Sequence, residues 1–93
     1  MLFLVISNPR PERPSSATRN RKKFWAWLKP KQAAKQCLMV YARPGRGAVA
    51  ILDVGSHEEL HELLNGWAEL IPAQFDVYPL IDPAAAKRYL NRK

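Results

Sequence analysis

The sequence has a single cysteine, Cys37, so no disulfide can form within the chain and no oxidising compartment is implied. It also lacks a long apolar run. The apolar residues 2–6 are followed directly by Ser7-Asn8-Pro9, and they are too few for a signal-peptide core or a membrane span. These absences predict a cytoplasmic protein without membrane association.

Acidic residues are scarce, and the first predicted helix has none. The 8 Asp and Glu face 15 Lys and Arg, which gives a net charge of +7 and a pI of about 10.0. Most of the basic residues lie in residues 10–35 and in the last seven residues. This balance favours an anionic partner, such as a nucleic acid, an acidic lipid, or a small carboxylate or phosphate ligand. The alternative is that the excess charge only keeps the protein soluble.

The 93 residues, 47% of them hydrophobic, predict one globular domain over residues 1–93. The strongest local signal is the helix after Ser56, which we expect to be its N-cap, with Glu59 completing a capping box. An apolar stripe marks its buried face, and Pro72 should end it. The stripe comprises Leu60, Leu63, Leu64, Trp67 and Ile71.

The other elements follow from periodicity and breakers. Strands are predicted at residues 2–6, 37–43, 48–54 and 75–81, and helices at 17–28 and 84–91. Ser15 or Ser16 should cap the first helix through its hydroxyl group, and Pro30 should end it. Residues 44–47 should form a hairpin turn, and Asp82-Pro83 should open the last helix.

This order predicts an α+β, ferredoxin-like βαββαβ domain with a four-stranded antiparallel sheet and a short C-terminal helix. Three of the strands are apolar at both parities, whereas a sheet with one wet face should alternate. Two helices cover one face, so the other face needs a cover. We expect a second copy to supply it, as a dimeric α/β barrel. The alternative is that the terminal helix folds over the open face.

Several stretches resemble the muconolactone isomerase family. They are Met1-Leu2-Phe3-Leu4-Val5, Asp53-Val54 with Ser56-x-x-Glu59-Leu60-His61-Glu62-Leu63-Leu64, and Phe75-Asp76-Val77-Tyr78-Pro79-Leu80. The resemblance implies a ferredoxin-like subunit, a dimeric α/β barrel and a larger ring of dimers. The chemistry does not transfer, because the family's acidic residue on the first helix and its His-Tyr-x-Asn stretch in the second hairpin have no counterpart here.

Two side chains are candidates for acid–base catalysis. Asp76 is a carboxylate on an otherwise apolar strand, and it shares a strand face with Tyr78. The alternative is that Asp76 pairs with a basic residue or faces solvent. His61 could act as a general base. His57 and His61 are four residues apart, but they lack a third metal ligand, so we expect no metal site.

Residues around the hairpin are candidates for ligand binding. Tyr41 could donate a hydrogen bond, and Arg43 or Arg46 could hold a carboxylate or stabilise an enolate-like oxygen. Trp25 could line a pocket for a flat ligand. The alternatives are a tyrosine at the barrel rim, arginines that only solubilise the turn, and a tryptophan that only packs.

Three function classes remain open. The first is a cofactor-independent isomerase or related enzyme for a small aromatic or lactone-like anion, with the pocket between the first helix and the sheet. The second is a non-catalytic ligand-binding or interaction protein of the same fold. The third is nucleic-acid binding through the basic residues 19–23, which the missing RNA-binding signature disfavours.

Overall fold

The computed structural model describes residues 1–11 and 13–92, with the side chains of residues 14–17 also outside the description. Four strands and three helices follow one another along the chain. They are β1 (Leu2–Pro9), α1 (Pro14–Ala33), β2 (Cys37–Ala42), β3 (Ala48–Asp53), α2 (His57–Leu70), β4 (Ala73–Leu80) and α3 (Pro83–Asn91).

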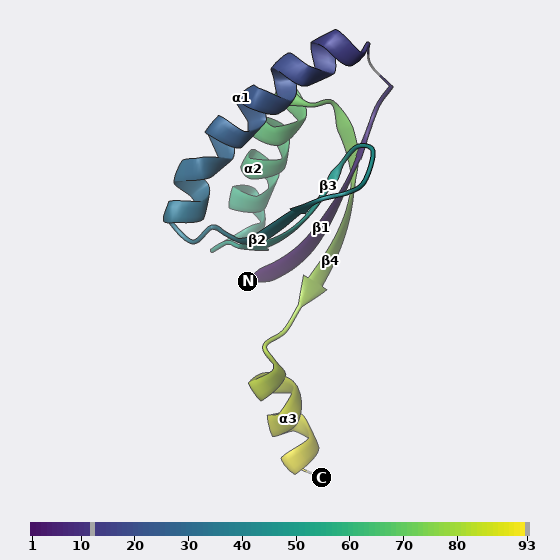
Figure 1. Ribbon diagram of the computed structural model, residues 1–93. Coiled ribbons are helices and arrows are strands. Elements are labelled where there is room, and N and C mark those ends of the chain that lie inside the picture. Colours follow the sequence, from purple (N-terminus) through teal and green to yellow (C-terminus); the bar gives the residue numbers. More distant parts are fainter. Residues whose placement is uncertain (12, 93) are drawn as a thin grey trace.

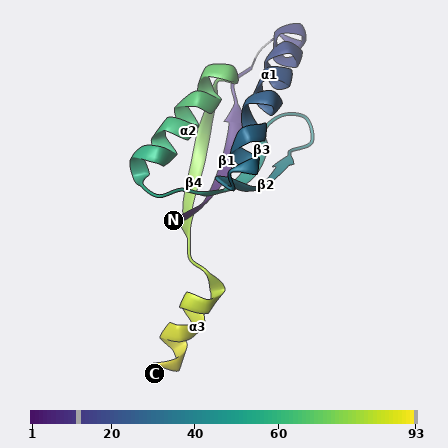
Figure 2. The same cartoon turned by 90° about the vertical axis from the view of Figure 1, so that its left-hand side faces the viewer.

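The strands form one antiparallel sheet in the order β2-β3-β1-β4. Strand β1 is central and pairs with β3 on one side and with β4 on the other. Helices α1 and α2 lie together over one face of this sheet (Figures 1 and 2). The arrangement is the predicted ferredoxin-like βαββαβ fold.

The hydrophobic core lies between the helices and the sheet. The period of two along a strand sends alternate side chains into it, so Phe3 and Val5 of β1 are buried. Residues Ala48, Ala50 and Leu52 of β3 follow the same rule. The helices contribute their inward stripes, which are Phe24 and Leu28 of α1 and Leu60, Leu63 and Trp67 of α2.

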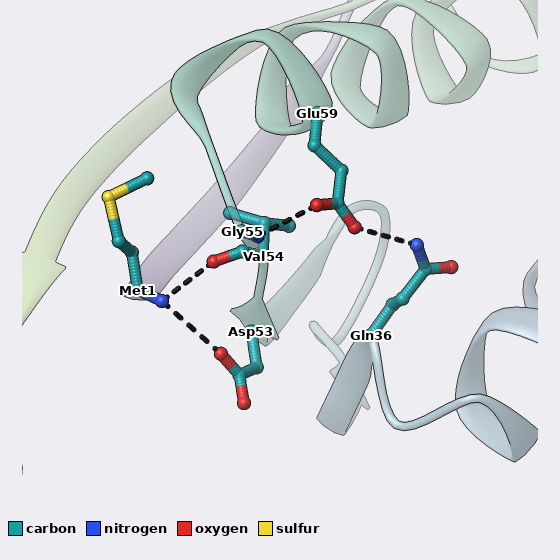
Figure 3. Close-up of polar contacts among 6 residues, drawn as sticks. All are labelled: Met1, Gln36, Asp53, Val54, Gly55 and Glu59. Carbon is teal, nitrogen blue, oxygen red and sulfur yellow. Dashed lines mark hydrogen bonds and ion pairs between the residues drawn. The ribbon is translucent and has the colours of Figure 1, made fainter.

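Helix α2 begins as predicted. The Ser56 hydroxyl accepts a hydrogen bond from the Glu59 backbone N–H at 3.1 Å. The Glu59 carboxylate accepts from the N–H of Gly55 at 2.7 Å and from the Gln36 side chain at 2.8 Å (Figure 3). These two bonds, the Gly55 bond foremost, lower the pKa of Glu59. In this capping box, the Glu59 carboxylate therefore binds the backbone N–H of Gly55, one residue before the N-cap residue Ser56.

The amino terminus is held beside this cap. The Met1 ammonium donates to the Val54 carbonyl at 2.6 Å and lies 3.4 Å from an Asp53 carboxylate oxygen (Figure 3). These contacts fix the start of β1 against the end of β3.

Two elements, β1 and α1, extend well beyond their predicted boundaries. Strand β1 continues through Ser7-Asn8-Pro9, because β4 pairs with it as far as Pro9 after its pairing with β3 has ended at Ser7. Helix α1 starts at Pro14, with Arg13 at its N-cap position, and passes through Pro30 to Ala33. The hydroxyl groups proposed as its cap, those of Ser15 and Ser16, lie outside the described side chains.

The second face of the sheet is open and mostly apolar. It presents Leu2, Leu4, Ile6, Met39, Tyr41, Val49, Ile51, Tyr78 and Leu80, which have the parity opposite to the core residues. The alternative that the terminal helix covers this face is wrong.

Helix α3 projects beyond the end of β4 and has no buried residue (Figures 1 and 2). Asp82 accepts a hydrogen bond from the Ala84 N–H, as expected of the predicted cap. Because Asp82 precedes a proline, its backbone is restricted to the extended region, which directs the helix away from the sheet. Among the described residues, no helix is both long and apolar enough to cross a lipid bilayer.

Candidate functional site

A cavity of about 200 Å³ lies between α1, the hairpin that joins β2 to β3, the end of β1 and the end of α2. Its apolar wall contains Phe24, Trp25 and Trp67, and the ring centroids of Phe24 and Trp67 are 4.9 Å apart. Its polar wall contains Ser7 and three arginines, Arg21, Arg43 and Arg46. The remaining lining residues are Pro9, Ala42, Gly45, Gly47, Ala48 and Ile71.

Neutral oxygens hold all three arginines in place. Arg21 donates to the Gly45 carbonyl at 3.2 Å, which ties α1 to the hairpin. Arg43 donates to the Ser7 carbonyl at 2.9 Å, and Arg46 donates to the Arg10 carbonyl at 3.0 Å. Within residues 1–11 and 13–92, the one recorded ion pair is that of the amino terminus with Asp53. Among the described residues, the cavity therefore carries positive charge without a paired carboxylate.

One guanidinium atom in this cluster has no partner among the described residues. It is the Nε atom of Arg46, which is buried and makes no hydrogen bond with them. An unsatisfied buried donor costs about 1–3 kcal/mol. A group that accepts this hydrogen bond would remove that cost.

Asp76 is linked to the arginine cluster through one residue. Asn8 accepts a hydrogen bond from Arg43 at 2.7 Å and donates through its side-chain nitrogen to the Asp76 carboxylate at 3.0 Å. Asp76 is exposed on the open face of β4, outside the lining of the cavity. It can therefore orient Arg43 through Asn8 without lining the cavity itself.

The hairpin packs closely against the end of β1. Gly45 and Gly47 have φ angles of +90° and +102°, as the two-glycine turn predicts. A Cβ atom built on Gly47 would lie 2.6 Å from the Ser7 carbonyl oxygen, whereas one on Gly45 would meet nothing within 4 Å. Only glycine at position 47 allows this wall of the cavity to close.

The structure brings three of the predicted site residues together and leaves four apart. Trp25, Arg43 and Arg46 line the cavity. Tyr41 and Tyr78 lie on the open sheet face, because their parity is opposite to that of the core residues on the same strands.

His61 also lies apart from the cavity, as Asp76 does. It is exposed on α2 beside buried Leu60, on the face turned away from the sheet, and lies 2.9 Å from the Asn65 side chain. The period of 3.6 residues per turn requires this orientation once Leu60 and Leu63 face inward.

Sequence reasoning missed two polar members of the cavity lining. Ser7 is only 1% exposed and shares the inward parity of Phe3 and Val5, so a polar residue at an inward position of β1 was the available signal. Arg21 lies on the helix that carries Phe24 three residues later, which places the two side chains on neighbouring parts of one face. By sequence, Arg21 and the other basic residues of 19–23 are candidates for a nucleic-acid-binding surface and not for the cavity.

Other residues outside the cavity have structural roles. Cys37 is buried at the start of β2, and burial raises the pKa of its thiol. The described residues contain no group of three or more His, Cys, Asp or Glu that could share a metal ion. Trp27 packs on Gly66 between the two helices and lies under the Lys31 ammonium at 4.2 Å.

The solved structures that share the fold include two enzymes. The chain is similar to 5-chloro-2-hydroxyhydroquinone dehydrochlorinase from Burkholderia phenoliruptrix, solved in complex with 2,5-dihydroxybenzoquinone. The TM-score is 0.69 at 23% identity, over 91% of this chain and 98% of that one. It is also similar to muconolactone isomerase, with a TM-score of 0.69 at 23% identity over 89% and 92% of the two chains. These likenesses confirm the fold that the resemblance implied.

No curated protein sequence matches the chain. One family model matches residues 1–93, the whole of the given sequence. It is described as a domain of unknown function (DUF3303). The chain belongs to this DUF3303 family.

Proposed function

We propose that the protein binds a small aromatic or lactone-like anion in the cavity between α1 and the hairpin, as a cofactor-independent isomerase or related enzyme. The observation that supports this most is the pairing of aromatic side chains with three arginines that have no carboxylate partner among the described residues. The aromatic wall suits a flat ring, and the guanidinium groups suit its negative oxygens.

The two structural neighbours agree with this ligand type. One was solved with 2,5-dihydroxybenzoquinone, which is a flat ring with four oxygen substituents, and the other acts on a lactone. In an isomerisation that moves a proton next to a carbonyl group, negative charge develops on an oxygen. An arginine such as Arg43 or Arg46 would stabilise this charge.

An isomerase of this kind requires a proton acceptor. None of the described lining residues is Asp, Glu or His. Asp76 is the nearest candidate by hydrogen bonding, through Asn8 and Arg43. His61 has no place in the proposed site, because it lies on the outer face of α2. This composition specifically favours the second candidate function, a ligand-binding protein without catalysis.

We also propose that the protein works as a homodimer or a ring of dimers. All four strands carry apolar side chains on the open sheet face, and exposed apolar patches of this kind mark interaction sites. A second copy supplies a surface of the same character, and packing the two sheets face to face would form the dimeric barrel. The enzyme and binding proposals share this assembly.

One experiment separates the two candidates. The protein is mixed with 2,5-dihydroxybenzoquinone or muconolactone in D₂O, and NMR follows both ligand line broadening and the replacement of ligand C–H by C–D. Binding with exchange above the protein-free rate supports the enzyme, and an Asp76→Asn variant should then lower the exchange rate. Binding without exchange supports the ligand-binding protein, and no binding of either compound contradicts the proposed function.

A further inference from the structure

We infer that the ligand of this cavity is a single small ring with two acidic groups, which enters as a dianion. The inference rests on the proposed function, since it names the class of compound that the same cavity would take. It depends on three observations, namely the uncompensated charge of the cavity, the unpaired Nε atom of Arg46 and the volume of the cavity.

The charge of the cavity calls for more than one negative group. Three guanidinium groups line it, and each is fixed by neutral carbonyl or amide oxygens. Among the described residues none of the three forms an ion pair. A monoanion would leave two of these positive charges uncompensated. A dianion leaves only one.

Arg46 offers the first attachment point. Its Nη1 atom donates to the Arg10 carbonyl, while its buried Nε atom has no partner. Within a guanidinium group the Nε–H and Nη2–H bonds share one edge, and this edge binds a carboxylate through two parallel hydrogen bonds. Because Nε is closed to solvent, an incoming carboxylate would meet Nη2 first and reach Nε after a small turn of the side chain.

Arg21 and Arg43 form the second attachment point. Arg43 is anchored at the end of β1 by Ser7 and Asn8, and Arg21 reaches from α1 to the hairpin. The two groups therefore approach the cavity from different elements. A ligand with acidic groups at two positions on a ring can engage this pair and Arg46 together, with its ring beside Trp25.

The volume limits the ligand to one ring. Cavities for drug-sized ligands span about 300–1,000 Å³, and this one holds about 200 Å³. A nucleotide exceeds this space, whereas a benzene ring with two carboxylates is of the right order. The aromatic side chains that line the cavity, those of Phe24, Trp25 and Trp67, provide the apolar surface that such a ring requires.

The test compares probes of equal shape and different charge at constant ionic strength. Benzamide, benzoate and the three benzenedicarboxylate isomers are titrated into the full-length protein, and tryptophan fluorescence reports binding, because Trp25 and Trp67 line the cavity. We expect at least one dicarboxylate to bind about tenfold or more tightly than benzoate, and benzamide to bind most weakly.

Variants test the role of Arg46. Arg46→Gln should lower the affinity of the best dicarboxylate about tenfold and bring it close to that of benzoate. Arg46→Lys, which keeps the charge but removes the two-bond edge, should give an intermediate loss and guards against a folding defect in the first variant. The matched control is Arg88→Gln on α3, which makes the same charge change far from the cavity and should leave the affinity unchanged.

The outcomes separate this inference from the proposed function. Equal binding of benzoate and all three dicarboxylates overturns the dianion class, while the cavity remains a binding site. Equal losses in Arg46→Gln and Arg88→Gln also overturn it, because they show a general effect of net charge. Binding of none of the five probes contradicts both the inference and the proposed function.

Discussion

Replacing Gly47 with alanine should damage the protein much more than the same change at Gly45. Both residues have positive φ angles, +102° and +90°. Alanine in this conformation costs about 1–2 kcal/mol at either position. The gain from a less flexible unfolded chain is also common to both, so it cancels in the comparison.

The difference between the two variants comes from space. The new Cβ atom at position 47 would lie 2.6 Å from the Ser7 carbonyl oxygen and 3.2 Å from Pro9 Cδ, and both groups belong to β1. The first contact is with backbone, so the hairpin itself must move. Overpacking of this kind costs about 1–3 kcal/mol. Gly45→Ala has no such contact. We expect Gly47→Ala to be less stable than Gly45→Ala by about 1–3 kcal/mol.

Urea denaturation followed by circular dichroism measures this difference, at one protein concentration for all variants because self-association shifts apparent stability. Since the displaced hairpin also carries Arg43 and Arg46, Gly47→Ala should weaken ligand binding as well. Equal stability of the two variants would refute the reasoning, because the hairpin would then not press against the end of β1.

Three further predictions concern the helix cap and the open face. Ser56→Ala should lower the free energy of unfolding by about 1 kcal/mol in urea, through the lost N-cap bond, and no loss would exclude that bond in solution. The lowered pKa of Glu59 means that its carboxylate stabilises the folded state above about pH 4.5 and that this contribution disappears as the pH falls through the lowered value. Glu59→Gln should therefore flatten the acid part of a stability–pH curve, whereas the control Glu62→Gln should not. Ile51→Glu should yield monomers in sedimentation velocity while Gln32→Glu on α1 does not, and an unchanged mass for Ile51→Glu would contradict self-association through the sheet.

Most of the fold could be predicted because local signals and global topology agree. Ser56 and Glu59 mark the start of α2, and short apolar runs between turn residues mark the strands. The boundaries of β1 and α1 could not be predicted from local signals. Asn8 remains in a strand because β4 pairs with it, and Pro30 remains in a helix because the chain continues in hydrogen bonds such as that from the Ala34 N–H to the Pro30 carbonyl.

The site was less accessible to sequence reasoning. The two hairpin arginines were found because a two-glycine turn places them at the sheet's end. Arg21 and Ser7 were not, because their roles depend on how α1 crosses the sheet and on which strand meets the hairpin. Asp76 was noticed as a carboxylate on an apolar strand. Its link to Arg43 runs through Asn8, 68 residues earlier in the chain, a contact that no spacing rule gives.

The central position of β1 has a consequence for protein synthesis. This strand is synthesised well before both of its neighbours, since Leu2 pairs with Asp53 and with Leu80. The contacts that complete the sheet thus join distant parts of the chain, and such contacts form slowly because a long loop must close first. Until β4 emerges, one backbone edge of the apolar strand β1 stays unpaired, which exposes the chain to aggregation. Slowing translation before residue 73 should therefore lengthen dependence on chaperones rather than help the domain to fold in steps.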